Sequence, residues 1–389
     1  MRVAFLIRSL TVGGAERQLT LLARGLAERG HYVCVVVFYR GGSLESELTN
    51  SSVEVLCPGK TGRWDLVGFL LRMVRLVSNR RPDVIYSMLP TSNLVALLLS
   101  RLGNRAPVIW GLRASLMQPA SYDWLGRLMQ WAERRLAGHA DGLIANSRAG
   151  LRLIGTRPGE RPSVRLIRNA LDAARFFPRP DMRLGMRKAL GVEDSALLVG
   201  LVGRLDPMKG HEVFLEAAML LRRRRSDVRF AIVGAGRSDR GEELRRRADH
   251  YGIADDVVWC TEISDMVAFY SAIDLLCSAS IYGEGFSNVL AEAMACECRC
   301  VATDVGDAVD IVGRWGRVVP PGDAANLALA MDQALAQPRG DEGPAMRRHI
   351  LDLCGKDEVI AQTEQFMLDL SGMDAEASAR REVPQIRTP

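Results

Sequence analysis

Two glutamates in one glycine-rich stretch are the residues of this sequence best suited to chemistry. Glu284 lies between Gly283 and Gly285, and Glu292 follows in a predicted helix that begins near Ser287. A carboxylate has two acceptor oxygens and can bind both hydroxyls of a vicinal diol. Glycines let the backbone come close to a ligand. We therefore expect the two glutamates to bind the alcohols of a small molecule.

The start of the same helix is suited to an anion. Ser287 or Asn288 can cap its first turn, and the backbone N–H groups and the helix dipole at that end favour a phosphate. A phosphate site between two diol sites matches a nucleotide sugar, which has a diphosphate in the middle, a ribose at one end and a hexose at the other. The stretch alone is equally compatible with a capped helix whose glutamates face solvent.

Two cations precede this stretch, Arg204 and Lys209, in the segment VGRLDPMKG (202–210). They follow a predicted strand and therefore lie where parallel sheets bind ligands. Lysine is rare here, because the 51 basic residues are almost all arginines, and this weakly favours a specific use of Lys209. Fixed cations would stabilise the charge on a departing diphosphate, a role that a metal ion has elsewhere. The alternative is that both are ordinary charges of a turn.

The elements that position these residues alternate along the chain. Predicted strands of the first half span residues 3–7, 33–38, 53–56, 84–86, 108–110, 142–145 and 164–167, and those of the second half span 197–202, 229–233, 257–260, 273–278, 299–303 and 318–319. Short apolar strands separated by helices indicate parallel, doubly wound sheets. We expect an α/β protein with two such Rossmann-like domains that face each other across a cleft.

The composition is that of a globular protein, with 48% hydrophobic residues, 25% charged residues and a net charge of +5. No apolar run reaches the roughly 18 residues that span a bilayer, and Arg8 interrupts the apolar N-terminal segment, unlike a signal peptide. Cys296, Cys298 and Cys300 lack the spacing of zinc ligands and have no histidine nearby. We expect the cysteines to be reduced and the protein to be cytoplasmic.

Arginines accompany tryptophans in two apolar segments, one at residues 64–77 and one around Trp131. The residues concerned are Arg63, Arg72, Arg75, Arg80, Arg81, Arg127, Arg134 and Arg135, together with Trp64 and Trp131. Tryptophan with arginine along a helix suits an anionic membrane surface, and a solvated helix face is the equal alternative. The arginines at 222–225 and 245–247 lack interleaved aromatic residues, so nucleic-acid binding is disfavoured.

In their order along the chain, the motifs resemble family 4 of the retaining glycosyltransferases, also known as glycosyltransferase group 1, which have the GT-B fold. The resemblance rests on Gly13-Gly14 after the first strand, Asn169-Ala170 with Asp172 and Phe176 at a predicted linker, Gly203-Arg204 with Lys209-Gly210, and Glu284-Gly285-Phe286 with Glu292. It covers nearly the whole chain. Such enzymes move a sugar from a nucleotide donor to an acceptor with retention at the anomeric carbon, and they need no metal ion or other cofactor.

The resemblance implies a set of binding residues. The donor site would comprise Gly13, Gly14, Gly203, Arg204, Lys209, Thr261, Ile263, Glu284, Gly285, Phe286, Ser287, Asn288 and Glu292, and the acceptor site would comprise Glu16, Arg17 and Arg113. Arg204 and Lys209 would hold the diphosphate. Glu284 would bind the sugar hydroxyls, so that these three residues form the expected catalytic group. Glu292 would bind the ribose diol.

The resemblance also implies a division of roles between the domains. Residues 1–175 would bind the acceptor and residues 176–350 the nucleotide sugar, with the nucleobase near Thr261 and Ile263. A helix within residues 351–372 would cross back to the first domain. Residues 373–389 are polar and charged, and we expect them to be disordered.

One position departs from the family pattern. Many relatives have a histidine in the loop after the strand at 108–110, whereas this chain reads GLRAS at 111–115. The contact that the histidine makes with the sugar 6-hydroxyl therefore has no counterpart of the same type here. Arg113 is the nearest polar residue, and we expect it to bind a phosphate of the acceptor instead.

The expected reaction moves a sugar, by default from a UDP-sugar, to a saccharide or polyprenyl-linked saccharide during synthesis of a surface polysaccharide, at the cytoplasmic face of the plasma membrane. The acceptor hydroxyl would attack from the front face and pass its proton to a departing phosphate oxygen. A covalent intermediate at Glu284 is the alternative. A sugar-nucleotide epimerase and a non-catalytic sugar-nucleotide sensor or scaffold are the competing functions.

Overall fold

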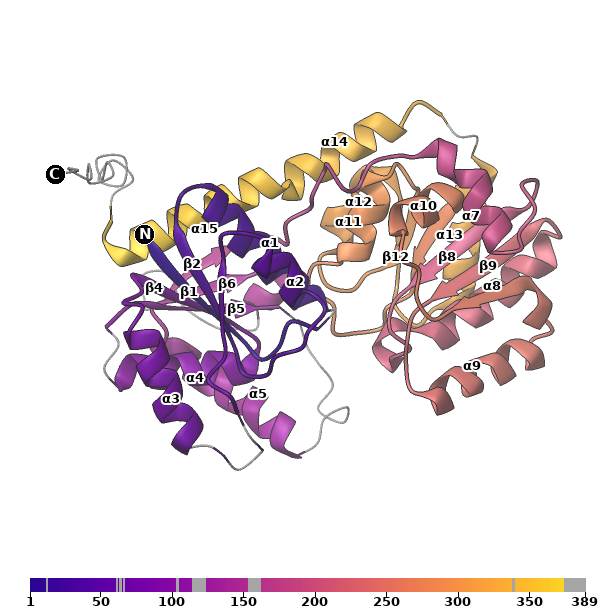
Figure 1. Ribbon diagram of the computed structural model, residues 1–389. Coiled ribbons are helices and arrows are strands. Elements are labelled where there is room, and N and C mark those ends of the chain that lie inside the picture. Colours follow the sequence, from indigo (N-terminus) through magenta and orange to yellow (C-terminus); the bar gives the residue numbers. More distant parts are fainter. Residues whose placement is uncertain are drawn as a thin grey trace.

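Two parallel β-sheets, one in each half of the chain, form the frame of the protein (Figure 1). They belong to a computed structural model that describes residues 1–373 except 12, 61, 63–64, 66, 103–104, 114–123, 153–161 and 338–339. The tail that we expect to be disordered lies outside the described residues apart from Met373. Arg63, Trp64 and the start of the helix predicted at 122–136 also lie outside them.

The first sheet has the strand order β3-β2-β1-β4-β5-β6-β7 in the described residues, and all neighbours pair in parallel. Its strands are β1 (Arg2–Ile7), β2 (Tyr32–Val37), β3 (Glu54–Leu56), β4 (Val84–Met88), β5 (Val108–Leu112), β6 (Gly142–Ala145) and β7 (Ser163–Leu166). The central strands β1 and β4 are almost completely buried. Their continuous apolar runs reflect a sheet that is covered by helices on both faces.

Helices cover the first sheet on two sides (Figure 1). One layer consists of α3 (Val67–Ser78), α4 (Pro90–Arg101) and α5 (Trp124–Leu136), and the other side holds α1 (Gly14–Glu28) with the short helix α2 (Glu45–Thr49). A further short helix, α6 (Arg148–Arg152), follows β6. Leu19, Leu22 and Leu26 of α1 pack into one core, and Phe69 and Met73 of α3 pack into the core on the opposite face.

The second sheet has the order β10-β9-β8-β11-β12-β13, again with parallel pairs. Its strands are β8 (Leu197–Val202), β9 (Val228–Val233), β10 (Val257–Cys260), β11 (Leu275–Ser278), β12 (Cys300–Thr303) and β13 (Arg317–Val319). The helices of this domain are α7 (Arg183–Ala189), α8 (His211–Arg224), α9 (Ser238–His250), α10 (Met266–Ala272), α11 (Asn288–Ala295), α12 (Ala308–Val312), α13 (Ala324–Ala336) and α14 (Gly343–Cys354). The order reverses beside β1 in the first sheet and beside β8 in the second, and such positions open ligand-binding crevices. The predicted pair of doubly wound α/β domains is confirmed.

The last helix, α15 (Lys356–Ser371), packs on the first domain (Figure 1). Ile360 and Phe366 of α15 are buried in the core beneath α1. A Cβ added to Gly25 of α1 would lie 2.1 Å from Cδ1 of Ile360, so α15 approaches α1 at a glycine. Gly355 separates α15 from α14, which packs on α11. The C-terminal segment therefore connects the two domains a second time.

Several short helices differ from the pattern expected from the sequence. The structure contains α2, α6, α7 and α12, of five to seven residues each, in segments where we predicted no helix. The helix α14 was also not predicted. One or two turns are too short to show an apolar periodicity of 3.6 residues, and the packing of the whole domain decides whether they form.

Candidate active site

The N-termini of α1 and α11 meet where the two domains join. A Cβ added to Gly14, the first residue of α1, would lie 3.4 Å from Nδ2 of Asn288, the first residue of α11. The positive ends of both helix dipoles therefore face the same region, which favours binding of a phosphate. The fold brings the Gly13-Gly14 turn together with the glutamate-bearing stretch of the other domain.

Lys209 and Glu284 form an ion pair between Nζ and Oε1. Ser280 donates a hydrogen bond from Oγ to the same carboxylate oxygen at 2.9 Å. Glycines allow this arrangement, because a Cβ at Gly203 would come within 3.2 Å of the Lys209 stem. Gly210 has a φ of +65°, and a Cβ there would lie 1.9 Å from the carbonyl oxygen of Ala279, so only glycine fits that position.

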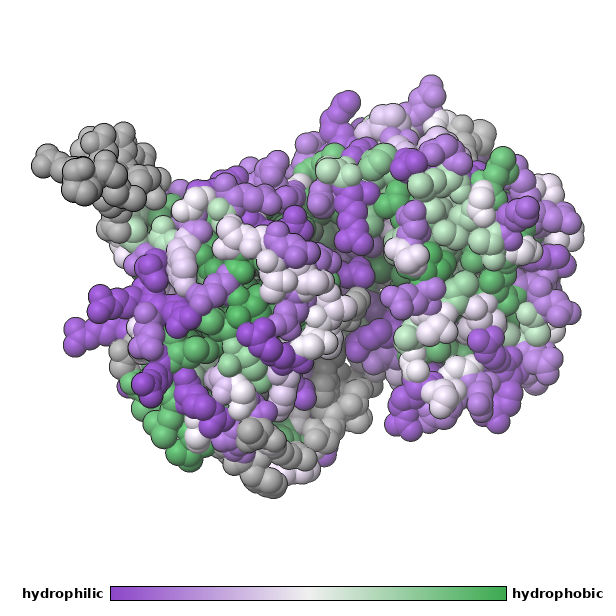
Figure 2. All heavy atoms as spheres, in the orientation of Figure 1, coloured by the Kyte–Doolittle hydropathy of each residue, from purple (hydrophilic) through white to green (hydrophobic). Residues whose placement is uncertain are grey.

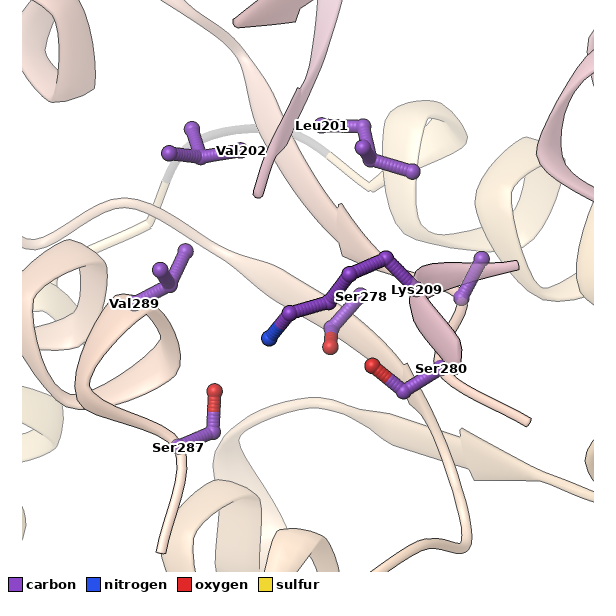
Figure 3. A pocket seen from close by; sticks show the side chains of 8 residues that line it. Leu201, Val202, Lys209, Ser278, Ser280, Ser287 and Val289 are labelled. Atoms are coloured by element: carbon purple, nitrogen blue, oxygen red, sulfur yellow. The ribbon is translucent and has the colours of Figure 1, made fainter. Parts of the chain in front are cut away.

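The Lys209 ammonium points into a small hollow together with serine side chains (Figure 3). The residues that line the hollow are Leu201, Val202, Lys209, Ser278, Ala279, Ser280, Ser287 and Val289. Lys209 comes from a 3-10 turn (Pro207–Lys209) that follows β8, and the other residues come from the carboxyl ends of β8 and β11 and from the start of α11. An ammonium donates three hydrogen bonds and a hydroxyl both donates and accepts. The hollow is thus suited to phosphate and sugar oxygens.

Arg204 is exposed at the junction of the domains. Within the described part of the chain, its guanidinium forms no ion pair or hydrogen bond. Glu16 of the first domain lies close to it: burial raises the pKa of Glu16, and the positive charge of Arg204 partly opposes this shift. An arginine that makes no hydrogen bond or ion pair within the described part of the chain, and that lies close to Glu16 of the other domain, is available to bind an anion.

The predicted capping of α11 by Ser287 or Asn288 is wrong. Ser287 occupies the N-cap position, but its side chain makes no capping hydrogen bond. Asn288 is already the first helical residue, and its Oδ1 accepts a hydrogen bond from Nδ2 of Asn169 at 2.8 Å. The asparagine therefore joins α11 to the other domain. Because Ser287 does not cap α11, the N–H groups of its first turn are available to a ligand.

The loop that carries Glu284 is held against the first domain. A Cβ at Gly285 would lie 2.7 Å from Oδ1 of Asn146, so this approach requires glycine. The carbonyl oxygen of Gly285 accepts a hydrogen bond from the N–H of Asp307 at 3.0 Å. The Asp307 carboxylate in turn accepts from the N–H groups of Arg148, at 3.0 Å, and Ala149, at 3.3 Å. These contacts fix the position of the loop.

Glu292 lies in a separate cavity between the domains, not in the hollow around Lys209. Tyr270 donates from its hydroxyl to Oε2 of Glu292 at 2.8 Å. Burial raises the pKa of Glu292, and this hydrogen bond and the charges of Arg17 and Arg175 partly oppose the shift. The cavity has a volume of about 120 Å³. Arg17, Arg24, Arg175 and Lys356 supply its cations.

Arg113 lies in a hydrogen-bond network rather than in an open pocket. Its Nη1 donates to Oδ1 of Asn169 and its Nη2 donates to the hydroxyl of Tyr86, each at 2.8 Å. Asn169 also holds Asn288 of α11. Arg113 therefore orients a residue that connects the two domains. Its contact with an acceptor phosphate stays a prediction.

Thr261 and Ile263 follow the edge strand β10. Thr261 is exposed, whereas Ile263 packs against the core of the second domain. Their predicted contact with a nucleobase stays a prediction. Tyr270, Asn146 and Asp307 were not predicted as partners, because each contacts a residue that is distant in sequence. Ser280 lies only four positions before Glu284, but its hydrogen bond to that carboxylate was not predicted either.

The architecture defines the class: two doubly wound domains that meet at a polar junction form a GT-B glycosyltransferase fold. A family model described as glycosyl transferase 4-like domain matches residues 13–170, and one described as glycosyl transferases group 1 matches residues 196–337. Together they span both domains, and the chain belongs to the group 1 glycosyltransferases of the GT4 type.

Curated relatives agree with this family. The chain is 33% identical over 218 residues to a GDP-mannose-dependent alpha-(1-6)-phosphatidylinositol monomannoside mannosyltransferase of Mycolicibacterium smegmatis, covering 54% of this chain and 56% of the relative. It is 28% identical to a D-inositol 3-phosphate glycosyltransferase of Pseudarthrobacter chlorophenolicus, covering 86% of this chain and 85% of the relative. The match thus spans about half the length of the first relative and most of the second.

Solved structures show the same fold. The chain is similar to Anabaena Alr3699/HepE in complex with UDP and glucose, with a TM-score of 0.81, 22% identity and coverage of 95% of this chain and 100% of that chain. It is also similar to sucrose-phosphate synthase from Thermosynechococcus elongatus, with a TM-score of 0.76, 21% identity and coverage of 95% and 99%. At these identities the likeness concerns the fold alone.

Proposed function

We propose that the protein transfers a hexose from a UDP-sugar to a hydroxyl of a saccharide or polyprenyl-linked saccharide, with retention at the anomeric carbon. The observation that carries this proposal is the Lys209–Glu284 ion pair, which lies beside the uncapped start of α11. It supplies a cation for the diphosphate and a carboxylate for the sugar hydroxyls within one site. The proposed role in surface polysaccharide synthesis follows from the acceptor class.

The proposed chemistry begins with the diphosphate at the N-terminus of α11, between Lys209 and Arg204. As the bond from the anomeric carbon to the phosphate oxygen breaks, negative charge grows on that oxygen, and the two cations and the helix N–H groups stabilise it. The acceptor hydroxyl attacks the same face and gives its proton to the departing oxygen. Fixed cations thus perform the task of a metal ion, which is why we propose metal-independent transfer.

Two features support Glu284 as a hydroxyl-binding group rather than a nucleophile. Its Oε1 already accepts from Ser280 and pairs with Lys209. An ammonium that pairs with a carboxylate stabilises its negative charge and lowers its nucleophilicity. A carboxylate held in this way keeps a constant orientation toward the sugar.

The interdomain cavity supports an acceptor that carries phosphate. Arg17, Arg24, Arg175 and Lys356 line it, and arginine binds phosphate oxygens in a bidentate manner. A saccharide linked to a polyprenyl carrier bears such phosphate groups. The relatives named above include, by name, an inositol 3-phosphate glycosyltransferase. An acceptor of this kind would bring the protein to the cytoplasmic face of the plasma membrane.

A GDP-sugar is the second candidate donor, because the mannosyltransferase that is 33% identical is GDP-mannose-dependent by name. A panel of UDP-, GDP- and ADP-sugars in a thermal unfolding assay separates the candidates. A ligand at 100 times its Kd adds about 2.7 kcal/mol to the free energy of unfolding. Stabilisation by UDP-sugars alone is the expected result, and stabilisation by GDP-mannose alone would contradict the UDP assignment.

The competing functions require a different measurement. Release of free nucleotide from the stabilising donor is followed with and without an extract of lipid-linked saccharides. A transferase releases nucleotide faster when acceptor is present. An epimerase would alter the sugar without releasing nucleotide, and a sensor would bind the donor without changing it.

A further inference from the structure

The outward face of α5 is both apolar and cationic. The exposed residues of this helix are Trp124, Arg127, Leu128, Trp131, Arg134 and Arg135. Their spacing of three and four positions places them on one face. Trp124 is 64% exposed, Leu128 43% and Trp131 63%. A helix on the surface of a globular domain normally turns its large apolar side chains inward, so this face has a different use.

The neighbouring helices extend this surface. Helix α4 contacts both α5 and α3. On α3, Val67 is 74% exposed and Leu71 is 65% exposed. Leu98 of α4 and Leu102 after it are also exposed. Figure 2 shows apolar atoms bordered by hydrophilic atoms along the lower edge of the first domain, where Figure 1 places α3. We name the exposed faces of α3, α4 and α5 the lower face.

The charge of the lower face has one sign. The described residues of α3, α4 and α5 include six arginines, Arg72, Arg75, Arg101, Arg127, Arg134 and Arg135, and one acidic residue, Glu133. Glu133 is turned inward and accepts a hydrogen bond from Nδ2 of Asn93 at 2.6 Å. Among the described residues, none forms an ion pair with Arg127, Arg134 or Arg135. These three arginines are therefore available to an anionic partner.

Two other partners fit this surface less well. In a symmetric contact with a second copy the same patch meets itself, so unpaired arginines would oppose arginines. A nucleic acid matches the charge, but it gains little from exposed Val67, Leu71 and Leu128, because aliphatic side chains do not stack on bases as aromatic ones do. An anionic bilayer surface satisfies both properties, since tryptophan and leucine enter the headgroup boundary and arginine contacts the anionic lipids.

We propose that the lower face binds an anionic phospholipid membrane, with α5 lying parallel to the bilayer surface. No helix in the described part of the chain is long and apolar enough to cross a bilayer, so attachment by the lower face would be peripheral. This inference deepens the membrane location within the proposed function and rests on that part of it. It does not depend on which sugar is transferred.

The test is sedimentation of the full chain with vesicles of phosphatidylcholine alone or mixed with phosphatidylglycerol. The wild-type protein should bind only the mixed vesicles, less tightly as salt is added, with a blue shift of tryptophan fluorescence. The variant R127E/R134E/R135E should lose at least about 100-fold in partition coefficient, since each of the three arginines contributes about fivefold near an anionic surface. The variant W124S/W131S should lose binding and the blue shift.

A matched control variant is R223E/R246E/R348E, which makes the same change of net charge at exposed arginines of the second domain. It should bind the vesicles better than R127E/R134E/R135E by a factor of ten or more. Equal losses in the two variants, or vesicle binding by R127E/R134E/R135E like that of the wild type, would overturn the proposal. Binding to an oligonucleotide instead of the vesicles, or lipid-free dimerisation through the lower face, would overturn it as well.

Folding and catalysis are measured separately. All substituted residues are exposed, so the variants should keep the wild-type unfolding temperature. Donor binding in the absence of lipid should be unchanged in R127E/R134E/R135E. If the wild type binds no nucleotide sugar but binds vesicles through the lower face, the proposed function fails and the membrane surface stands. If instead the wild type binds a nucleotide sugar but does not bind vesicles through the lower face, the membrane proposal alone fails.

Discussion

Lys209 and Glu284 form an ion pair although 75 positions separate them in the chain. Their side chains are only 20% and 12% exposed. The pair brings the turn after β8 against the loop before α11, at the hollow shown in Figure 3. The partly shielded cation and anion neutralise each other's charge. In a ligand that carries both groups, the ammonium can bind phosphate and the carboxylate can bind hydroxyls.

Loss of this pair should affect stability and transfer differently. Lys209→Met leaves the Glu284 carboxylate without its cation and should lower the free energy of unfolding by about 1–3 kcal/mol. The double variant K209M/E284Q should regain part of that stability, but transfer should remain about 100-fold to 1000-fold below the wild type. Urea unfolding and kcat/KM of Lys209→Met, Glu284→Gln and the double variant give the coupling energy. Strictly additive effects would contradict a direct interaction.

Arg204 should contribute to catalysis and not to stability. Its exposed guanidinium has no partner in the described part of the chain, so Arg204→Gln should change the free energy of unfolding by less than about 0.5 kcal/mol. Transfer should nevertheless fall by about tenfold to 100-fold, because a charged hydrogen bond to phosphate is lost. Arg204→Lys should recover part of the loss. A variant with unchanged kcat/KM would remove Arg204 from the diphosphate site.

Glu292 should bind a ribose hydroxyl of the donor. Tyr270 occupies its Oε2, which leaves Oε1 for a ribose hydroxyl. The wild type should prefer a donor with ribose over its 2′-deoxy analogue by about tenfold or more. This preference should disappear in Glu292→Gln, while Tyr270→Phe should reduce it by misplacing the carboxylate. Full discrimination by E292Q would show that another residue binds the diol.

The stability of the first domain should depend on the protonation of Glu133. Burial raises the pKa of Glu133 to about 7, despite the hydrogen bond from Asn93 and the nearby charge of Arg134. The folded chain therefore keeps a proton that the unfolded chain releases near the ordinary glutamate value. The free energy of unfolding should fall by about 1–3 kcal/mol as pH rises from about 5 to about 7. Glu133→Gln keeps the acceptor oxygen and should abolish this fall, as thermal unfolding at several pH values can show.

Arg113 allows a test of its predicted acceptor role. Arg113→Ala removes hydrogen bonds to Asn169 and Tyr86, and it should lower the free energy of unfolding by about 1–3 kcal/mol. If it also binds acceptor phosphate, the KM for the acceptor should rise as well. Tyr86→Phe is the matched control, because it removes one of these hydrogen bonds and keeps the guanidinium. An unchanged acceptor KM in R113A would restrict Arg113 to positioning Asn169.

The sequence alone determined the fold class and the residue types of the site. Buried strands are continuous apolar runs, and most helices of three or more turns show a period of 3.6 residues, so both follow from local patterns. The twelve-residue helix α14 is an exception, because it was not predicted. The motifs around Lys209 and Glu284 also follow from the sequence, because each lies next to a strand or helix end. The short helices α2, α6, α7 and α12 were missed, since a helix of one or two turns depends on its packing.

Only the tertiary structure decided how these motifs meet. A pattern of residues does not reveal that Asn288 bonds to Asn169 instead of capping its own helix, because that choice depends on a partner 119 positions away. It also does not reveal that Glu284 and Glu292 face different spaces, or that Arg113 is bound inside the protein. Side-chain partners between domains are set by distances that arise when two separately wound sheets come together. Single segments therefore predicted which residue types form the site, whereas the arrangement of those residues followed only from the folded chain.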